Sequence, residues 1–77
     1  MNPIEALRTM MDSEGISVRK LGTLMGKSPL YAKNVLYGRK SMPNVSIFAE
    51  MADACGYDLL VRRRSNGDEI PIDYDEW

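Results

Sequence analysis

Histidine is absent from this chain of 77 residues, and cysteine occurs once, at Cys55. Without histidine, the usual zinc sites and any imidazole base or nucleophile are excluded, and a single cysteine excludes an internal disulfide. No apolar run approaches the length of a membrane-spanning helix, about 18 residues. The first ten residues, MNPIEALRTM, lack the pattern of a secretory signal peptide. We therefore expect a small cytoplasmic protein that binds no cofactor or metal and is not an enzyme.

The charges of the chain are segregated along the sequence. The formal net charge is −1, which taken alone argues against a nucleic-acid partner. Residues 15–49, however, contain six cations and no anion, whereas residues 68–77 contain five anions and no cation. The six cations are Arg19, Lys20, Lys27, Lys33, Arg39 and Lys40. Because an electrostatic field is local, this segment can bind phosphates whatever the total charge. The alternative is a solvated basic face without a partner.

The spacing of the apolar residues predicts four helices, each between a capping residue and a glycine. The expected caps are Asn2, Ser17, Ser28 and Asn44, and the expected ends are Gly15, Gly26, Gly38 and Gly56. Pro29 is expected in the first turn of the third helix, where proline is favoured. The side chains expected to face the core are Ile4, Leu7, Met11, Val18, Leu21, Leu24, Met25, Ala32, Val35, Leu36, Phe48, Met51, Ala52 and Cys55. Residues 1–56 are therefore expected to form one helical domain.

After Gly56 the apolar period changes from helical spacing to alternation, which is typical of strands. Asn66-Gly67 predicts a hairpin with a two-residue type I′ turn. The register expected from that turn pairs Leu59 with Tyr74, Val61 with Ile72 and Arg64 with Glu69, and places Pro71 opposite Arg62. Residues 57–74 are thus expected to form a β-hairpin, and residues 75–77 an acidic tail that ends in Trp77.

An isolated hairpin is marginally stable in water, so this one is expected to have a partner. Pro71 blocks the outer edge of the second strand, whereas the edge of the first strand is open to pairing. We predict that the first strand pairs with its copy in a second chain, which gives a four-stranded sheet and a two-fold homodimer. The expected interface residues are Leu59, Leu60, Val61, Ile70, Ile72 and Tyr74. Arg62, Arg63 and Arg64 are interpreted as hairpin and interface charge.

The stretch ISVRKLGTLMGKSPLYAKNVLYGRKSMPNVSIFAEMADACG resembles the helix-turn-helix domain of the Cro/repressor type. With the first helix included, the resemblance covers residues 4–56. It rests on GRKSMP and on Leu21, Gly26, Ser28, Ala32, Val35, Phe48, Met51 and Ala52. Two positions depart from the family, which usually has alanine at Gly22 and leucine at Cys55. The resemblance implies a mainly α fold of four to five short helices that bind double-stranded DNA.

Members of that family place the third helix in the major groove. By resemblance, the residues expected to read bases are Pro29, Leu30, Lys33 and Asn34. The residues expected to bind phosphates are Arg19, Lys20, Lys27, Ser28, Tyr31, Tyr37, Arg39, Lys40 and Ser41. Asn34 can pair with adenine, Lys33 can donate to guanine or phosphate, and Leu30 can pack on a thymine methyl group. For Leu30 and Tyr31, a protein interface or packing on the first helix is the alternative.

The function expected from these features is transcriptional regulation, as a dimeric repressor of a palindromic operator. Two alternatives stay open. The strand and the acidic tail with Trp77 also resemble antitoxins that partner HipA-type kinases, in which the DNA-binding dimer also holds a toxin. The third possibility is a phage-encoded inhibitor that uses the domain only to bind another protein.

Overall fold

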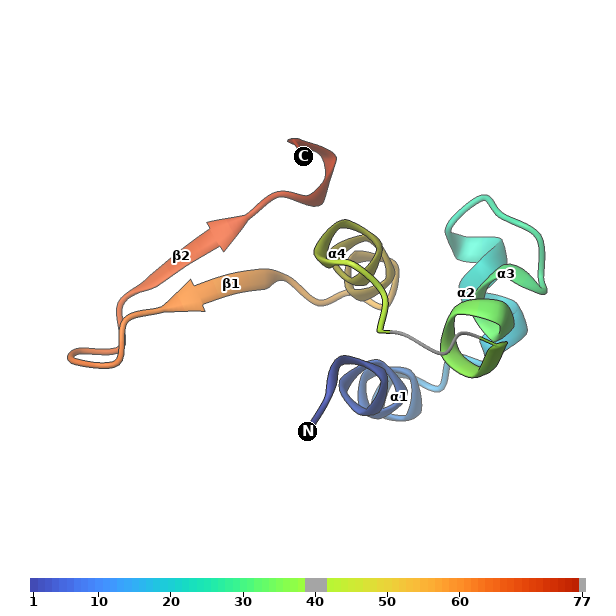
Figure 1. Cartoon of the computed structure of the whole chain (residues 1–77), viewed down its shortest axis with the longest axis horizontal. Helices are drawn as coiled ribbons and strands as arrows, with labels where there is room; N and C mark the ends of the chain where they lie inside the picture. The colour runs from blue at the N-terminus through green and yellow to red at the C-terminus, as the bar shows by residue number, and fades with distance from the viewer. Residues whose placement is uncertain (39–41, 77) are drawn as a thin grey trace.

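The computed structural model describes residues 1–38 and 42–76. Within that part of the chain it is mainly helical, with four α-helices followed by a two-stranded antiparallel hairpin, so the predicted fold class is confirmed (Figure 1). The elements are α1 (Pro3–Glu14), α2 (Val18–Leu24), α3 (Tyr31–Lys33), the π-helical turn η1 (Asn34–Gly38), α4 (Val45–Ala54), β1 (Leu59–Arg62), β2 (Glu69–Ile72) and the 3₁₀ turn η2 (Tyr74–Glu76). None of the helices in residues 1–38 and 42–76 has the length and apolar character that crossing a membrane requires.

Three of the four predicted N-caps are confirmed. The Asn2 side chain accepts a hydrogen bond from the Glu5 N–H at 2.8 Å, and the Glu5 carboxylate accepts one from the Asn2 N–H at 3.2 Å, which makes a capping box. The side chains of Ser17 and Asn44 likewise accept from the N–H three residues further on, at 3.1 and 2.8 Å. Each of these bonds satisfies a donor that a helix terminus leaves without a partner.

The third helix begins later than its sequence predicts. The Ser28 hydroxyl accepts from the Leu30 N–H at 3.2 Å, and the Tyr31 N–H donates to the Ser28 carbonyl at 2.9 Å. These bonds close a turn that contains Pro29 and Leu30, so α3 begins at Tyr31, with Leu30 at the N-cap position and no side-chain cap. Ser28 therefore caps the turn that precedes the helix. From Asn34 onward the helix widens into η1.

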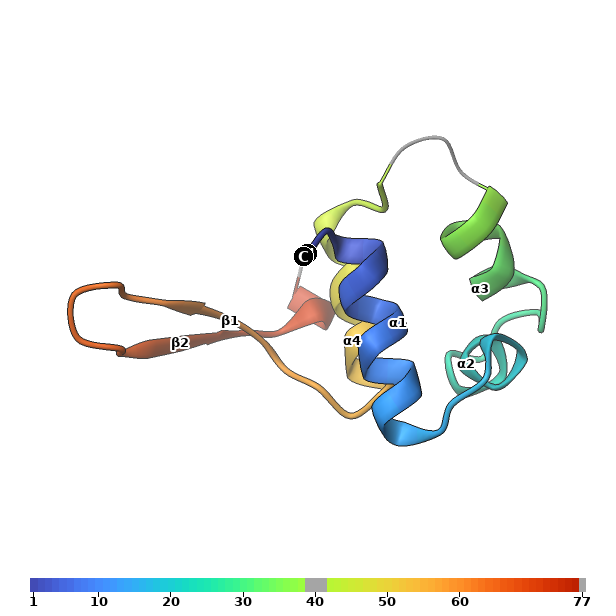
Figure 2. The same cartoon turned by 90° about the horizontal axis from the view of Figure 1, so that it is seen from below.

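The hydrophobic core lies between the four helices. Its buried side chains are Leu7, Met11, Leu21, Ala32, Val35, Leu36, Ala49, Met51, Ala52 and Cys55. Helix α4 contacts α1, α2, β1 and η2, so it lies at the centre of the molecule (Figures 1 and 2). The prediction that Leu24 faces the core is wrong, because its side chain is 48% exposed. Helix α2 has only seven residues, and Leu24 in its last turn lies beyond the narrow stripe that meets the other helices.

Gly22 is the point at which the chain folds back most closely on α2. A Cβ atom at this buried position would lie 2.5 Å from the carbonyl oxygen of Ser28, which is backbone and cannot turn aside. Steric exclusion of a Cβ atom therefore explains why glycine stands at this position, where the Cro/repressor type of domain usually has alanine. It lets the segment from Ser28 to Pro29 lie against the helix.

We expect Gly22→Ala to lower the free energy of unfolding by about 1–3 kcal/mol, a typical cost of overpacking. This loss runs against helix propensity, which favours alanine by about 1 kcal/mol. Gly38→Ala is the matched control, since the nearest atom to its added Cβ is Asn34 Oδ1 at 3.8 Å, an ordinary contact. Urea denaturation should leave that variant as stable as the parent or slightly more stable. An equal response of the two variants would contradict this account of Gly22.

The hairpin forms, but with a register that differs from the predicted one by two residues. The pairs are Leu59 with Ile72, Leu60 with Pro71, Val61 with Ile70 and Arg62 with Glu69. The two-residue turn and the pairs derived from it are therefore wrong. The even shift leaves Leu59, Val61, Ile70 and Ile72 on one face, as expected for strands, in which side chains alternate.

The side chain of Asn66 explains the longer turn. It accepts from the Asp68 N–H at 3.0 Å and donates to the Asp68 carboxylate at 2.9 Å. A type I′ turn needs positive φ at both central residues, yet no residue other than glycine has positive φ in the described part of the chain. Only Gly67 has it here, with a φ of 81°. Four residues, 64–67, therefore connect Arg63 to Asp68, whose backbone groups are hydrogen-bonded at 2.7 Å.

The chain after β2 turns back onto the helical domain. Tyr74 lies in η2, which contacts α4, so it does not pair with Leu59 (Figure 1). Asp75 lies in the same turn, and Trp77 lies outside the described residues. The end of the described chain is thus placed beside α4, at the base of the hairpin.

Candidate nucleic-acid interface

Helices α2 and α3 lie at one end of the molecule, and the hairpin projects from the other end (Figure 1). The molecule measures 40 × 25 × 23 Å along its principal axes. Gly26, with a φ of 71°, ends α2, and the Lys27 N–H donates to the Gly22 carbonyl at 2.9 Å. This is a common way for a helix to end, since it satisfies a terminal carbonyl and reverses the chain. Helices α2 and α3 are therefore held in contact by a short, defined turn.

The four candidate base-reading residues are all exposed. Pro29 and Leu30 lie in the turn before α3, Lys33 is the last residue of α3, and Asn34 is the first residue of η1. Leu30 is 61% exposed, so this large apolar side chain is not part of the core. The four residues come from one continuous segment at the same end of the molecule. Their side chains offer an amide, an ammonium group and an apolar surface to a partner.

Helix α2 supplies a second set of exposed cations beside this segment. Arg19 and Lys20 occupy its first turn, where the helix dipole disfavours positive charge. With Ser17, Thr23 and Leu24 they line a shallow hollow on the outer side of the helix. The exposed position of Leu24, which the sequence pattern missed, adds an apolar surface between these polar groups. An anion with an apolar neighbour would fit such a hollow.

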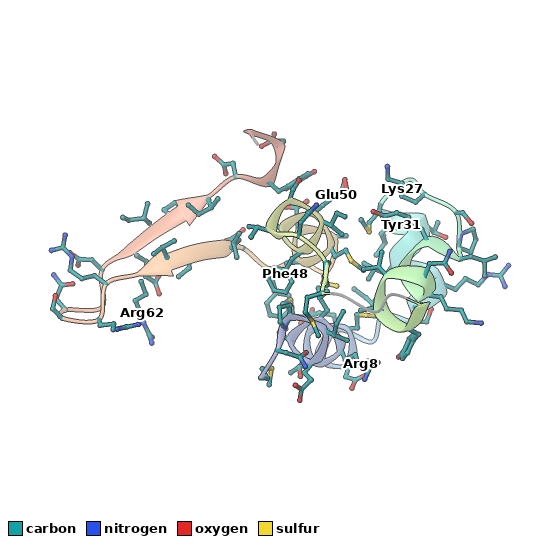
Figure 3. The ribbon with its side chains drawn as sticks, viewed as in Figure 1. Arg8, Lys27, Tyr31, Phe48, Glu50 and Arg62 are labelled. Carbon is teal, nitrogen blue, oxygen red and sulfur yellow. The ribbon has the colours of Figure 1, made fainter. Side chains whose placement is uncertain are left out.

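The two tyrosines among the candidate phosphate ligands have different surroundings. Tyr31 is half-buried and packs against the core, and Lys27 Nζ lies 5.7 Å from its ring centroid (Figure 3). Tyr37 is 56% exposed, and Arg8 Cζ lies 4.5 Å from its ring centroid. Both distances suit a cation–π contact. Tyr31 therefore packs against the core with part of its ring, and Tyr37 lies largely outside it.

Arg8 is a candidate that the sequence did not single out. It belongs to α1 and lies outside the basic segment, so only the fold brings it to η1. Ser28 is exposed, and its hydroxyl accepts from the Leu30 N–H, which leaves the hydroxyl proton free to donate. Arg39, Lys40 and Ser41, the remaining candidate phosphate ligands, lie outside the described residues.

Acidic residues are concentrated on the side of α4 that faces β1 and η2. A cavity of about 190 Å³ between α4, β1 and η2 is lined by residues that include Asp53, Asp58, Asp73 and Asp75. The negative charge of Asp53 raises the pKa of the Tyr74 hydroxyl at this cavity. Among the described residues, no group of three or more His, Cys, Asp or Glu side chains could hold a metal ion. The fold therefore keeps this acidic region apart from the basic surface of α2 and α3.

The single cysteine lies in the core rather than in a site. Cys55 is 4% exposed, and burial raises the pKa of its thiol, with a further contribution from the negative charge of Glu14. Nearby, Tyr57 donates a hydrogen bond to Glu14 at 3.0 Å, and this bond raises the pKa of the Tyr57 hydroxyl. A thiol with a raised pKa is a poor nucleophile at neutral pH. Cys55 is therefore a packing residue.

Comparison of the chain with protein-family models, with curated proteins and with solved structures gave no match in any of the three.

Proposed function

We propose that this protein binds double-stranded DNA in a sequence-specific manner and regulates transcription, as a dimeric repressor of a palindromic operator. The observation that carries the proposal is the charge of the α2–α3 surface. Arg19, Lys20, Lys27 and Lys33 are exposed around two helices joined by a tight turn, and residues 15–49 contain no acidic residue. Such a surface fits the phosphate backbone of a duplex.

The same surface carries groups that can distinguish base pairs. The Asn34 amide can make two hydrogen bonds to adenine, and Lys33 can donate to guanine in the major groove. Leu30, exposed in the turn before α3, can pack on the methyl group of thymine. Arg8, held over Tyr37, extends the positive surface onto α1 and is suited to an adjacent phosphate. Phosphate contacts would fix the position of the domain, and base contacts would give its specificity.

The position of the hairpin is compatible with a dimer that reads two half-sites. It lies at the end of the molecule opposite to α2 and α3, so dimerisation through it leaves both α2–α3 surfaces free (Figure 1). Half-sites of a palindrome are separated by one helical turn, about 34 Å, or by a multiple of it. Selection of bound sequences from random duplex DNA by the protein alone would test the proposal. We expect an enriched palindrome, and the absence of any enriched sequence would overturn the proposal.

On the selected site, Asn34→Ala is expected to weaken binding by about 1–3 kcal/mol and to relax the preference at one position. Lys20→Ala should weaken all sequences alike and reduce the slope of log K against log salt by about one, as for a phosphate contact. Arg64→Ala removes a cation from the hairpin and serves as the control, with an unchanged salt slope. If Asn34→Ala and Lys20→Ala bind every sequence as the parent does, the interface is wrongly placed.

The antitoxin hypothesis depends on Trp77, which lies outside the described residues, and no observation on the described residues favours the inhibitor hypothesis. We therefore do not extend the proposal to them. A protein that selects no DNA sequence would favour a protein-binding role for the same fold.

A further inference from the structure

The outer edge of β1 is unpaired in the single chain. Among residues 1–38 and 42–76, the sheet consists of β1 and β2, and it projects away from the helices (Figures 1 and 2). The Arg63 N–H donates to the Asp68 carbonyl, so by alternation the N–H and C=O groups of Leu60 and Arg62 point away from β2. The same alternation directs the nitrogen of Pro71 to the outer edge of β2, which lacks a donor there. Of the two edges, β1 is therefore the one suited to pairing.

The side chains of this hairpin also lack cover. Leu60 is 40% exposed, Val61 57% and Ile70 63%. Exposed apolar side chains beside an open strand edge are typical of a surface that another strand completes. A second copy of the chain carries the same edge, and two copies can pair about a two-fold axis.

The sequence of β1 and the residue before it, Asp58-Leu59-Leu60-Val61-Arg62, is complementary to its own reverse. When two copies pair antiparallel with Leu60 facing Leu60, Asp58 lies opposite Arg62 of the second copy, and the same pair recurs on the other side of the axis. Leu59 then lies opposite Val61 of the second copy, again twice. Opposite-charge pairs and apolar pairs directly across strands are both stabilising.

Neighbouring registers lack this match. In an antiparallel ladder, two opposed residues both point their backbone groups toward the partner strand or both point them away. In a two-fold pair of identical strands, the axis must therefore pass through a residue that faces its own copy. With Val61 on the axis, Leu60 lies opposite Arg62. With Leu59 on the axis, Asp58 lies opposite Leu60. The register with Val61 on the axis also brings Asp58 opposite Arg64, but Arg64 lies beyond the end of β1. Only the register centred on Leu60 combines opposite-charge pairs and apolar pairs within residues 58–62.

The acidic cavity provides an independent reason for the same register. Continuing the β1–β2 register by one pair places Asp58 opposite Asp73, and both residues line the cavity at the base of the hairpin. Like charges directly opposite each other are unfavourable. A cation from a second copy beside Asp58 would offset this repulsion, and Arg62 lies on the hairpin away from the helices, where it can reach a second copy (Figure 3).

We propose that β1 pairs with β1 of a second copy about a two-fold axis at Leu60, and that Arg62 of each copy binds Asp58 at the acidic cavity of the other. The partner of this edge is thus a second copy of the chain, selected by charge. This inference specifies the dimer of the proposed function, but its test uses no DNA. Failure of the interface is therefore distinguishable from failure of DNA binding.

The test is an exchange of charge between two variants. Asp58→Arg and Arg62→Asp each place like charges opposite each other at both ends of the strand. Each variant alone should dimerise about 10- to 100-fold more weakly than the parent, as the loss of two favourable cross-strand pairs and the gain of two repulsive pairs implies. An equal mixture of the two variants should form a heterodimer, because both of its charge pairs are again complementary. Sedimentation velocity on the free proteins, alone and mixed, measures these states.

The double variant Asp58→Arg/Arg62→Asp should restore the homodimer, which keeps the test decisive if one single variant does not fold. A mixture of Asp58→Arg with Arg64→Asp is the control for register, since these residues would be opposite only with Val61 on the axis. Arg64→Asp keeps Asp58 and Arg62, so it should dimerise with itself as the parent does, and Asp58→Arg should stay as weakly associated in that mixture as it is alone. A parent that is monomeric at micromolar concentration, or an Asp58→Arg plus Arg62→Asp mixture that does not associate, would overturn the proposal.

Discussion

Leu21→Ala is expected to lower the free energy of unfolding by about 2–5 kcal/mol, the usual cost of removing a buried leucine side chain. Leu21 has no exposed surface and is one of the three largest fully buried side chains, with Leu7 and Met51. A domain of this size has a total stability of only about 4–12 kcal/mol. The substitution should therefore remove a large share of it, which urea denaturation followed by circular dichroism would measure.

The same substitution three residues later is the matched control. Leu24 belongs to the same helix but is 48% exposed, so Leu24→Ala should cost less than about 1 kcal/mol. Both changes replace leucine by alanine in α2 and differ mainly in burial. If the two variants lose stability equally, α2 packs on the core through another face than the one the structure gives.

The pair of leucines also shows what apolar spacing can and cannot predict. The pattern correctly identified α2, its Ser17 cap and the inward position of Leu21. It could not place Leu24, because the width of the buried stripe depends on how closely the neighbouring helices approach. The resulting exposed leucine beside Arg19 and Lys20 is part of the candidate interface. Local sequence thus predicted the helix, and tertiary packing decided which residues of its outer face are available to a partner.

Side-chain hydrogen bonds account for the two local errors. The hydroxyl of Ser28 was expected at a helix N-cap but caps the preceding turn, and Asn66 was expected within a two-residue turn but holds Asp68 instead. Serine and asparagine compete with regular backbone pairing by bonding to nearby N–H groups. These residues therefore predict where a helix or strand is interrupted more reliably than they predict the geometry of the turn at that point. The candidate base-reading segment begins inside one of these breaks, because Pro29 and Leu30 lie in the turn that Ser28 caps.

Features that join distant parts of the chain could not be read from local sequence. Arg8 of α1 lies over the ring of Tyr37 in η1, and the four aspartates of the acidic cavity come together because η2 returns to α4. The steric need for Gly22 is of the same kind, since it arises from the carbonyl of Ser28. In contrast, the self-complementary pattern of residues 58–62 can be recognised from the sequence alone. The open edge of this strand was also predicted from the sequence, and the structure adds the β1–β2 register.

Val61→Asp is expected to convert the proposed dimer to a monomer and to weaken the proposed binding to a full palindrome by about 10²- to 10⁴-fold. Val61 is 57% exposed in the single chain, so the helical domain should stay folded. In the proposed sheet, however, the new carboxylate lies opposite Leu59 of the second copy, on the apolar face. Two linked half-sites bind far more tightly than one because the second contact is intramolecular. A monomer loses that advantage while its own α2–α3 surface is unchanged.

Binding to a single half-site distinguishes this loss of linkage from damage to the interface with DNA. Val61→Asp should bind an isolated half-site as the parent domain does, measured by fluorescence anisotropy with labelled duplexes. Val61→Thr, which keeps the branched shape of the side chain without a charge, is the control and should stay dimeric with most of its affinity for the palindrome. A monomeric Val61→Asp that binds the palindrome as tightly as the parent would show that the two half-sites are not linked through the hairpin. Dimerisation through β1 would then have a role other than linking two half-sites on DNA.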